Sequence, residues 1–534
     1  MLFQLLGFLA FTGFVAVFAF WKLRNQSLDT KEGFFLGGRS LTGWVIAGSL
    51  LLTNISTEHL VGMNGSAYRN GAIIIAWEVT SALALVVAAL YFAPRYLKMG
   101  ITTVPEFLEQ RFDGLVRTLV AGLLMLSLVT TLLPIVLYTG ALNIESIFGL
   151  SNWLNISQEM GIWLTVLVVG GIGAVYAIFG GLKMVAYTDS INGVGLLLLG
   201  LAIPILALWS IGGGNPLNGL QQVFAHAPEK FNVISDEPGI GTGSRSAILP
   251  FSVLFTGLMI NQVYFWAMHQ HIIQRALGAT SLAEAQKGFL ITGVLKLLIP
   301  LVVVLPGLIG FYYFGDSLYD QADTVYPQLV KKVLPVGWSG LFVAVLLGAI
   351  LSTFNSALNS AATLFSLDVY QRYWRPTASD RQLVWVGRLV TTILAALAIL
   401  VAPYVANAPA GLYQLMQQLN GIFFVPIATV IIAGFAFPSV TAKGALAGLV
   451  FGLLFYITLE YIWQVPLHFV HIWGIEFVLN LIIMHLVSRF DAPTDWSGIK
   501  DRGVVPMQPW RHAVWMSWVL VIITVLVYIW LGQN

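Results

Sequence analysis

The chain has 534 residues, of which 58% are hydrophobic and only 9% are charged, and its formal net charge is +2. Soluble domains carry about a quarter charged residues, so this composition excludes a large soluble domain and predicts that most of the chain lies in a membrane. The chain contains no cysteine, which excludes disulfides, thiolate nucleophiles and cysteine metal sites, and the small net charge gives no reason to expect a nucleic acid partner.

Long apolar runs follow one another along the chain. A helix needs roughly 20 apolar residues to cross a bilayer, and about fourteen runs meet that requirement. The first run has no charge before Lys22, so we interpret it as a retained spanning helix and not as a cleaved signal. The predicted spans fall near residues 1–21, 41–66, 71–94, 117–148, 160–179, 184–211, 247–271, 288–314, 335–366, 383–403, 405–435, 440–463, 466–488 and 512–531.

The basic residues predict an orientation for these spans. Among the 26 lysines and arginines, Lys296 lies inside a predicted span and most of the others lie in every second linker. The alternate linkers hold only Arg69, Lys230, Arg245, Lys331 and Lys332. Because cytoplasmic loops carry the excess of basic residues, this asymmetry predicts a multi-pass inner-membrane protein with both termini outside.

Two predicted spans carry polar residues that lipid would not tolerate. The run Thr53–His59 is almost wholly polar, and the run Thr256–Gln262 places Gly257 shortly before two adjacent amides. Helices that are broken inside the membrane free backbone carbonyls and side chains to bind ions and solutes, and the filter of a channel is the alternative. We therefore predict two broken helices around a transport site.

Two opposite charges lie well inside predicted spans, where ionisable residues are expensive and gather at functional sites. They are Glu78 and Lys296. We predict that the carboxylate accepts, and the ammonium donates, hydrogen bonds to a polar, uncharged ligand. The alternative is a structural salt bridge between two helices.

Other ionisable residues receive plainer interpretations. Glu460 and Glu476 lie near the ends of predicted helices, where interfacial positions are expected, and Glu58 suits either an interfacial or a functional role. His269 and His271 flank the cytoplasmic end of a predicted helix, so we expect their side chains to be solvated.

Two hydroxyl residues, Ser352 and Thr353, lie side by side deep in a predicted span. Close packing of small residues is one explanation. The other is that their hydroxyls join the carbonyls of a broken helix in binding sodium, because hard cations prefer oxygen ligands. The sequence contains no Walker A loop and no His-Glu-x-x-His motif, so neither ATP-driven transport nor a metalloenzyme is expected.

Several motifs occur in order along the chain, among them Asn54-Ile55-Ser56, Trp77-Glu78, Thr103–Phe107, Gln270–Arg275 and Leu295-Lys296. Together they resemble the sodium/solute symporter family, in particular a bacterial member of its sodium/glucose cotransporter branch. The resemblance runs from about residue 33 to the last predicted helix.

The resemblance implies an all-α polytopic membrane protein whose core is two inverted five-helix repeats, with the first and sixth core helices broken. It also implies one extra helix before the core and three helices after it. Residues 1–32 would form the extra helix and a linker, 33–211 the first repeat, 212–246 an external loop, 247–438 the second repeat and 439–534 the three C-terminal helices.

The resemblance further implies the two ligand sites and the gates around them. It places a sugar among Asn54, His59, Glu78, Ser81, Gln262, Lys296 and Gln417. It places sodium among the carbonyls of Leu52, Ile55 and Ala349 and the hydroxyls of Ser352 and Thr353, with Asp189 behind them. Phe265 stands where relatives usually have tyrosine, and it would form the inner gate with Tyr264. The outer lid would consist of Met63, Trp77 and Tyr413.

The function implied is a sodium-coupled symporter, not an enzyme, that imports glucose or galactose by alternating access, with the sugar, sodium and the lipid bilayer as its partners. The second hypothesis is a symporter of the same fold for inositol, sialic acid, an amino acid or a monocarboxylate, although Glu78 would repel an acid. A sensor that does not transport is the third. Ala349 and Asn355 offer no clear second sodium site, which favours one sodium ion per sugar, and the oligomeric state stays open.

Overall fold

The computed structural model describes residues 2–23, 28–234, 249–407, 412–492, 496 and 498–532. Arg24, Arg245 and parts of the predicted segments 212–246, 405–435 and 489–511 lie outside the described residues. Within them the chain forms helices and no strand, apart from a single bridge between Leu41 and Ala279. The all-α prediction is confirmed.

The helices before residue 235 include most of those that surround the site described below. They are α1 (Leu2–Leu23), α2 (Lys31–Leu36), α3 (Gly43–Asn54), α4 (Asn64–Asn70), α5 (Ala76–Val79), α6 (Ser81–Val87), α7 (Ala93–Met99), α8 (Val104–Arg111), α9 (Gly114–Ser127), α10 (Leu133–Phe148), α11 (Leu150–Leu154), α12 (Gln158–Ile211) and α13 (Pro216–His226).

The helices after residue 248 continue in the same manner. They are α14 (Gly257–Ala267), α15 (Gln270–Leu277), α16 (Leu282–Leu298), α17 (Pro300–Val303), α18 (Leu305–Phe314), α19 (Val325–Val333), α20 (Ser339–Leu364), α21 (Asp380–Val401), α22 (Leu412–Ala436), α23 (Ala442–Ile457), α24 (Phe469–Ser488) and α25 (Ala513–Leu531).

The described residues contain nine helices that are long and apolar enough to span a bilayer, or ten if the bent pair of α16 with α17 and α18 is one span. One of the nine is α12, which breaks at Gly181, where a φ of 60° lies in the left-handed region that glycine tolerates. It therefore covers two predicted spans, 160–179 and 184–211. Because α3 and α14 have only 12 and 11 residues, neither counts as a span by itself, and the figure of fourteen stays a prediction.

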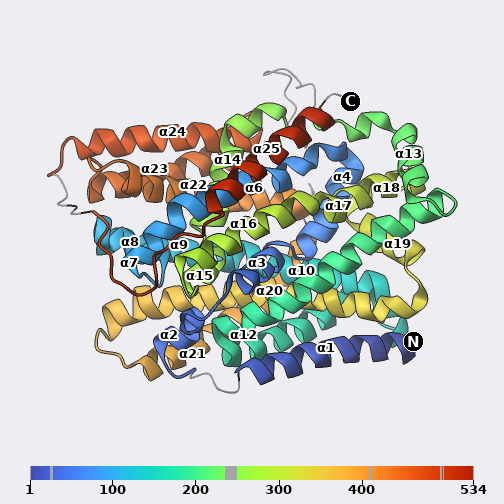
Figure 1. Ribbon diagram of the computed structural model, residues 1–534, viewed down its shortest axis with the longest axis horizontal. Helices are drawn as coiled ribbons and strands as arrows, with labels where there is room; N and C mark the ends of the chain where they lie inside the picture. The colour runs from blue at the N-terminus through green and yellow to red at the C-terminus, as the bar shows by residue number, and fades with distance from the viewer. Residues whose placement is uncertain are drawn as a thin grey trace.

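The long helices run between two ends of the molecule (Figure 1). The start of α1 and the end of α25 lie at the end that also holds α13. The helices α7 and α8, together with the connection from α24 to α25, lie at the opposite end. Both ends of the described chain are thus on the same side of the bundle, as an even number of crossings requires.

Both predicted interruptions are present. The helix α3 ends at Asn54, and Ile55 is extended, with φ −93° and ψ 100°. The chain then resumes as a π-helical turn, His59–Met63, that leads into α4. Before α14, a short 3₁₀ turn ends at Thr256, whose φ of −117° and ψ of −110° are not helical.

The broken helix α3 lies at the centre of the bundle, where it packs against α12, α16 and α20. Small residues allow this close approach. Gly48 of α3 faces Ser190 of α12, and a Cβ on Gly48 would lie only 2.8 Å from the Ser190 Cα. Gly288 of α16 likewise faces Ile46 of α3 with no room for a side chain. The backbone of α3 is therefore held from two sides, up to the residue at which it breaks.

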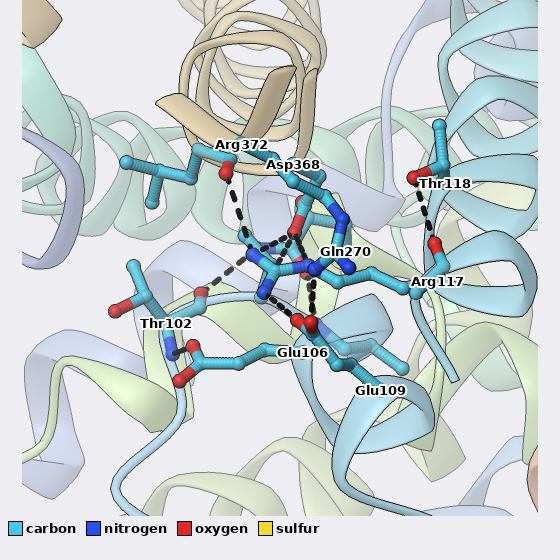
Figure 2. A network of polar contacts seen from close by, with 12 residues as sticks. Thr102, Glu106, Glu109, Arg117, Thr118, Gln270, Asp368 and Arg372 are labelled. Atoms are coloured by element: carbon cyan, nitrogen blue, oxygen red, sulfur yellow. Dashed lines mark hydrogen bonds and ion pairs between the residues drawn. The ribbon is translucent and has the colours of Figure 1, made fainter. Parts of the chain in front are cut away.

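A network of polar contacts joins helices at the end of the molecule that holds α8 (Figure 2). Arg117 donates hydrogen bonds from Nε to Asp368 at 2.6 Å and from Nη1 to Glu109 at 2.5 Å. Arg372 also pairs with Glu109, and Gln270 joins the start of α15 to the backbone at the start of α8. Because Asp368 is fully buried, Arg117 supplies the charge that balances it there.

The interfacial prediction for Glu460 and Glu476 is wrong. Glu476 is fully buried, and Glu460 is only 5% exposed. The Nδ2 of Asn480, one helical turn further along α24, donates to Glu476 Oε1 at 3.4 Å. Glu460 lies in the last turn of its helix, whereas Glu476 lies well inside α24, and neighbouring helices cover both. Glu58 is buried as well, which removes the interfacial option for that residue.

Candidate functional site

A cavity of about 60 Å³ lies between the two broken helices. Its walls come from segments far apart in the sequence: the end of α3, the region of α5 and α6, the end of α9, α14 with the start of α15, and α22. The lining residues are Asn54, His59, Trp77, Glu78, Ser81, Ser127, Thr131, Leu132, Asn261, Gln262, Phe265, His269, His271, Tyr413, Met416, Gln417 and Asn420. Most of them can form hydrogen bonds, so the cavity suits a small polar molecule.

Of the residues predicted to hold a sugar, all except Lys296 line this cavity. Lys296 lies behind the wall, where its Nζ donates to Asn54 Oδ1 at 2.6 Å and to Glu78 Oε2. Lys296 and Glu78 are both buried. The ammonium thus fixes the orientation of two cavity side chains, and the predicted pair of opposite charges is present as a salt bridge between helices.

The other oxygen of the Glu78 carboxylate faces an imidazole. His59 Nε2 lies 3.8 Å from Glu78 Oε1, and His59 Nδ1 lies 3.3 Å from Glu58 Oε1. Tyr413 packs edge-on against the His59 ring at a centroid distance of 5.4 Å. Glu78 can therefore accept a hydrogen bond from a ligand while Lys296 balances its charge.

Gln262 and Ser81 are already bonded to each other. Gln262 Nε2 donates to the Trp77 carbonyl at 2.7 Å and to Thr80 Oγ1 at 3.1 Å. Its Oε1 accepts from Ser81 Oγ at 2.9 Å. These bonds fix α14 to the α5–α6 region directly at the cavity wall, so both side chains are positioned before any ligand arrives.

Two of the three residues predicted to form an outer lid contact each other. Trp77 and Tyr413 pack edge-on with a centroid distance of 6.0 Å. Both line this cavity and also a second cavity of about 40 Å³, which Arg69 and Asp323 border. The two aromatic rings therefore separate the two spaces. Met63, the third predicted lid residue, is fully buried and lines neither space.

At the other end of the cavity, only one of the two predicted gate residues reaches the wall. Phe265 lines the cavity, whereas Tyr264 is fully buried behind it. His269 and His271 line the cavity beside Phe265 and are 4% and 1% exposed. The prediction that these histidines are solvated is therefore wrong, because the start of α15 packs against α3, α14 and α20.

The residues predicted to bind sodium meet where α3 and α20 pack together. Thr353 Oγ1 donates to the Thr53 carbonyl at 3.0 Å and lies 3.4 Å from the Leu52 carbonyl. Ser352, the preceding residue of α20, is buried, and its hydroxyl lies beside the Asp189 carboxylate. Hydroxyl and carbonyl oxygens thus gather at the broken end of α3, which is the donor set that a hard cation needs.

Asp189 lies next to these oxygens, as predicted. Its Oδ2 accepts from Ser49 Oγ at 2.7 Å and lies 3.4 Å from Thr53 Oγ1 and 3.6 Å from Arg275 Nη2. Asp189 and Arg275 are both buried. The carboxylate is therefore paired, and it also lies beside the Ser352 hydroxyl of α20. Ile55 and Ala349, the other predicted carbonyl ligands, are buried in the same region.

Sequence reasoning missed several lining residues. Ser127 and Thr131 come from the end of α9 and its extension, and Ser127 Oγ donates to Asn420 Oδ1 at 3.3 Å. Asn261 is the neighbour of the predicted Gln262. Hydroxyl residues inside an apolar span were the available signal for Ser127 and Thr131, but such residues also bond to their own helix, as Thr131 does to the Ser127 carbonyl.

A family model described as "Sodium:solute symporter family" matches residues 34–452. The chain belongs to the sodium:solute symporter family. The match covers both broken helices, the cavity between them and the oxygens gathered at α3 and α20. The protein is therefore a sodium-coupled solute symporter and a multi-pass membrane protein, and it is not an enzyme.

Relatives in the family agree along most of their length. The chain is 44% identical to an uncharacterized symporter, YidK, of Escherichia coli over 95% of this chain and 87% of that protein. It is 35% identical to a sodium/glucose cotransporter of Vibrio parahaemolyticus over 83% of this chain and 82% of that protein. It is 28% identical to the human sodium/myo-inositol cotransporter 2 over 90% and 75%, respectively.

A solved structure has the same fold. A sodium-coupled sialic acid symporter in a substrate-bound, outward-open state superposes with a TM-score of 0.78 and 20% identity, covering 92% of this chain and 98% of that chain. Mhp1, a nucleobase-cation-symport-1 family transporter, matches with a TM-score of 0.52 and 14% identity over 86% of this chain and 96% of that chain. Both are similar to this chain in fold.

Proposed function

We propose that the protein imports a hexose, glucose or galactose, together with sodium by alternating access. The observation that carries the proposal is the donor and acceptor set of the 60 Å³ cavity, in which Glu78 is held in place by Lys296 and flanked by Asn54, His59 and Gln417. A sugar hydroxyl both donates and accepts, so it can satisfy a carboxylate, an amide and an imidazole in turn. The sodium/glucose cotransporter relative at 35% identity supports the same substrate class.

Under this proposal sodium binds to the carbonyls of Leu52, Ile55 and Ala349 and to the hydroxyls of Ser352 and Thr353. The ion enters from the side on which both termini lie and leaves inward past Asp189. Transfer of one charge across the membrane is worth about 2.3 kcal/mol per 100 mV, which drives accumulation of the uncharged sugar. A stoichiometry of one sodium per sugar follows from this single set of oxygens.

The proposal includes the topology. Fourteen spans, with both termini outside an inner membrane, agree with the basic linkers and with the position of both chain ends on one side of the bundle (Figure 1). Residues 33–211 and 247–438 form the two inverted repeats, 1–32 and 439–534 the flanking helices, and 212–246 an external loop. In this orientation the Trp77–Tyr413 pair is the outer lid, and Phe265 lies at the inner gate.

The test is uptake of labelled glucose, galactose and myo-inositol into proteoliposomes, with an inward sodium gradient and with a matched potassium gradient as control. We expect sodium-dependent uptake and counterflow of one or both hexoses. Absence of hexose uptake with robust myo-inositol uptake would overturn the hexose assignment and keep sodium symport.

The second candidate, myo-inositol, rests on one observation. The human sodium/myo-inositol cotransporter 2 matches 90% of this chain. The cavity offers no feature that demands a ring oxygen, and a cyclic polyol presents the same hydroxyl chemistry. Sialic acid and monocarboxylates are disfavoured, because the Glu78 carboxylate at the cavity wall repels an acid.

A further inference from the structure

Two buried histidines at the inner end of the cavity have no role in the function proposed so far. His269 and His271 line the cavity and are 4% and 1% exposed. His269 immediately precedes α15, and His271 is its second residue. Gln270, between them, is bonded to the backbone of Thr102 and Val104, so the segment is anchored to α8.

The contact between the two rings defines what they offer to a ligand. Their Nδ1 atoms are hydrogen-bonded to each other. Such a bond holds one hydrogen, so one ring has its proton on Nδ1 and the other ring must have its proton on Nε2. The neutral pair therefore presents one Nε2–H donor and one bare Nε2 acceptor. A hydroxyl group needs that combination, because it donates one hydrogen bond and accepts others.

Another unsatisfied polar group lies at the Glu78 end, where Asn261 precedes Gln262 on α14. Asn261 lines the cavity, is 5% exposed, and its Oδ1 has no hydrogen-bond partner among the described residues. A buried carbonyl oxygen of this kind costs about 1–3 kcal/mol unless a ligand or water donates to it. The cavity thus offers an unsatisfied amide oxygen at the Glu78 end as well as the two imidazoles at its inner end.

The histidine end of the cavity lies some distance along the chain from the Glu78 end. His269 follows Gln262 by about two helical turns, which corresponds to ~10 Å along the direction of α14. Gln262 is bonded to Ser81 and Trp77 beside Glu78. A pyranose ring that forms a hydrogen bond on each of two opposite sides spans a comparable length.

We propose that His269 and His271 form a second hydrogen-bonding station, which binds a hydroxyl of the substrate on the side opposite to Glu78. The proposal rests on the proposed function, because it assumes a substrate with hydroxyl groups at both ends. The histidine pair then determines which polyol is accepted, since an analogue without that hydroxyl leaves buried polar atoms unpaired.

The experiment combines a variant with a set of analogues. The double variant His269→Phe/His271→Phe keeps two flat rings beside Phe265 and removes the hydrogen bonds. Uptake of the parent hexose and of its five monodeoxy analogues is measured in proteoliposomes for wild type and variant. We expect kcat/KM for the parent hexose to be about tenfold lower in the variant than in wild type, which is the usual effect of losing such a bond. For one of the analogues, kcat/KM should be the same in both proteins.

Control variants make the result of this experiment interpretable. His485→Phe removes an imidazole from α24, which contributes no residue to the cavity, and should leave the uptake rates of the parent and all analogues unchanged. The single variants His269→Gln and His271→Gln retain hydrogen bonding through an amide. If the double variant does not fold, the same comparison of analogues is made with these two single variants.

The possible results distinguish failure of the histidine station from failure of the proposed function. The station is refuted if the variant transports the parent hexose at the wild-type rate, or if its kcat/KM falls by the same factor for every analogue. Either result leaves the proposal of hexose symport intact. A wild-type protein that takes up no hexose, in the presence of sodium, refutes the proposed function and this inference with it.

Discussion

The buried pair of Glu78 and Lys296 allows a structural role to be separated from a role in substrate binding. Each side chain is 1% exposed, and the ammonium also donates to Asn54. The perturbation is a cycle of three variants: Glu78→Gln, Lys296→Met and the double variant. Both replacements keep roughly the volume of the original side chain, so they change charge more than packing.

The magnitudes follow from burial. Removal of one partner from a buried ion pair leaves an uncompensated charge and costs about 3–5 kcal/mol, whereas replacement of both partners is often neutral. We expect each single variant to be destabilised by about that amount and the double variant to recover most of the loss. The matched control is Lys443→Met. Its pair with Asp491 has a lysine that is 73% exposed, so removal should change stability by less than about 1 kcal/mol.

Two measurements on purified protein complete the cycle: thermal unfolding in detergent, and the further stabilisation produced by sodium and by hexose. The recovered double variant should still respond to sodium, because the oxygens of α3 and α20 are intact, and should not respond to hexose. A double variant as unstable as the sum of the single variants would refute the ion-pair reasoning. A stable double variant that transports hexose at the wild-type rate would remove Glu78 from the substrate site and leave the pair as a structural salt bridge.

Three further outcomes are expected. Thr353→Val should raise the sodium concentration that gives half-maximal uptake about tenfold or more. The control is Thr391→Val, which removes a hydroxyl that bonds only within α21 and should leave this concentration unchanged. Equal effects of the two variants would contradict the sodium assignment. Trp77→Ala should open the wall between the two cavities. A cysteine introduced at Ser81 should then react faster with a polar thiol reagent that is added from outside. An unchanged rate of labelling would show that Trp77 does not act as a lid. Burial raises the pKa of Glu109, but hydrogen bonds from Arg372 and Arg117 outweigh it and hold that pKa below its usual 4.5. The stabilisation is therefore present above pH 4.5 and is lost as pH falls through the folded pKa, so the difference in unfolding temperature between wild type and Glu109→Gln should shrink in acid; a constant difference would exclude this origin.

The broken helices could be predicted because their signal is local. A polar run such as Thr53–His59 in an apolar span has few physical explanations, and the extended Ile55 lies within it. The roles of individual side chains were harder to predict. Lys296 was expected to touch the ligand, yet a long side chain can equally turn to a partner on another helix, and here it bonds to Glu78 and Asn54 outside the cavity lining.

Three of the wrong predictions share one cause. His269, His271 and Glu460 lie near helix ends, where an isolated helix in a membrane would meet water or headgroups. Their burial depends on which helices cover those ends, namely α3, α14 and α20 at the start of α15. That information is long-range, and periodicity along one segment contains none of it. Asn261 was passed over for a related reason, since two adjacent amides on one helix give no indication of which side chain faces a partner.

The position of α3 explains how sodium and the solute can be coupled without a distant signal. Within three residues, the Leu52 and Thr53 carbonyls meet Thr353, and the Asn54 side chain reaches the cavity, where Lys296 holds it. Under the proposed function, an ion bound among those carbonyls reduces the freedom of the broken end and so orders Asn54 before the solute arrives. Linkage requires the reverse effect to be equal, so the solute must tighten sodium by the same factor. Because both ligands order the same short segment, the strength of coupling depends on how loose that segment is in their absence.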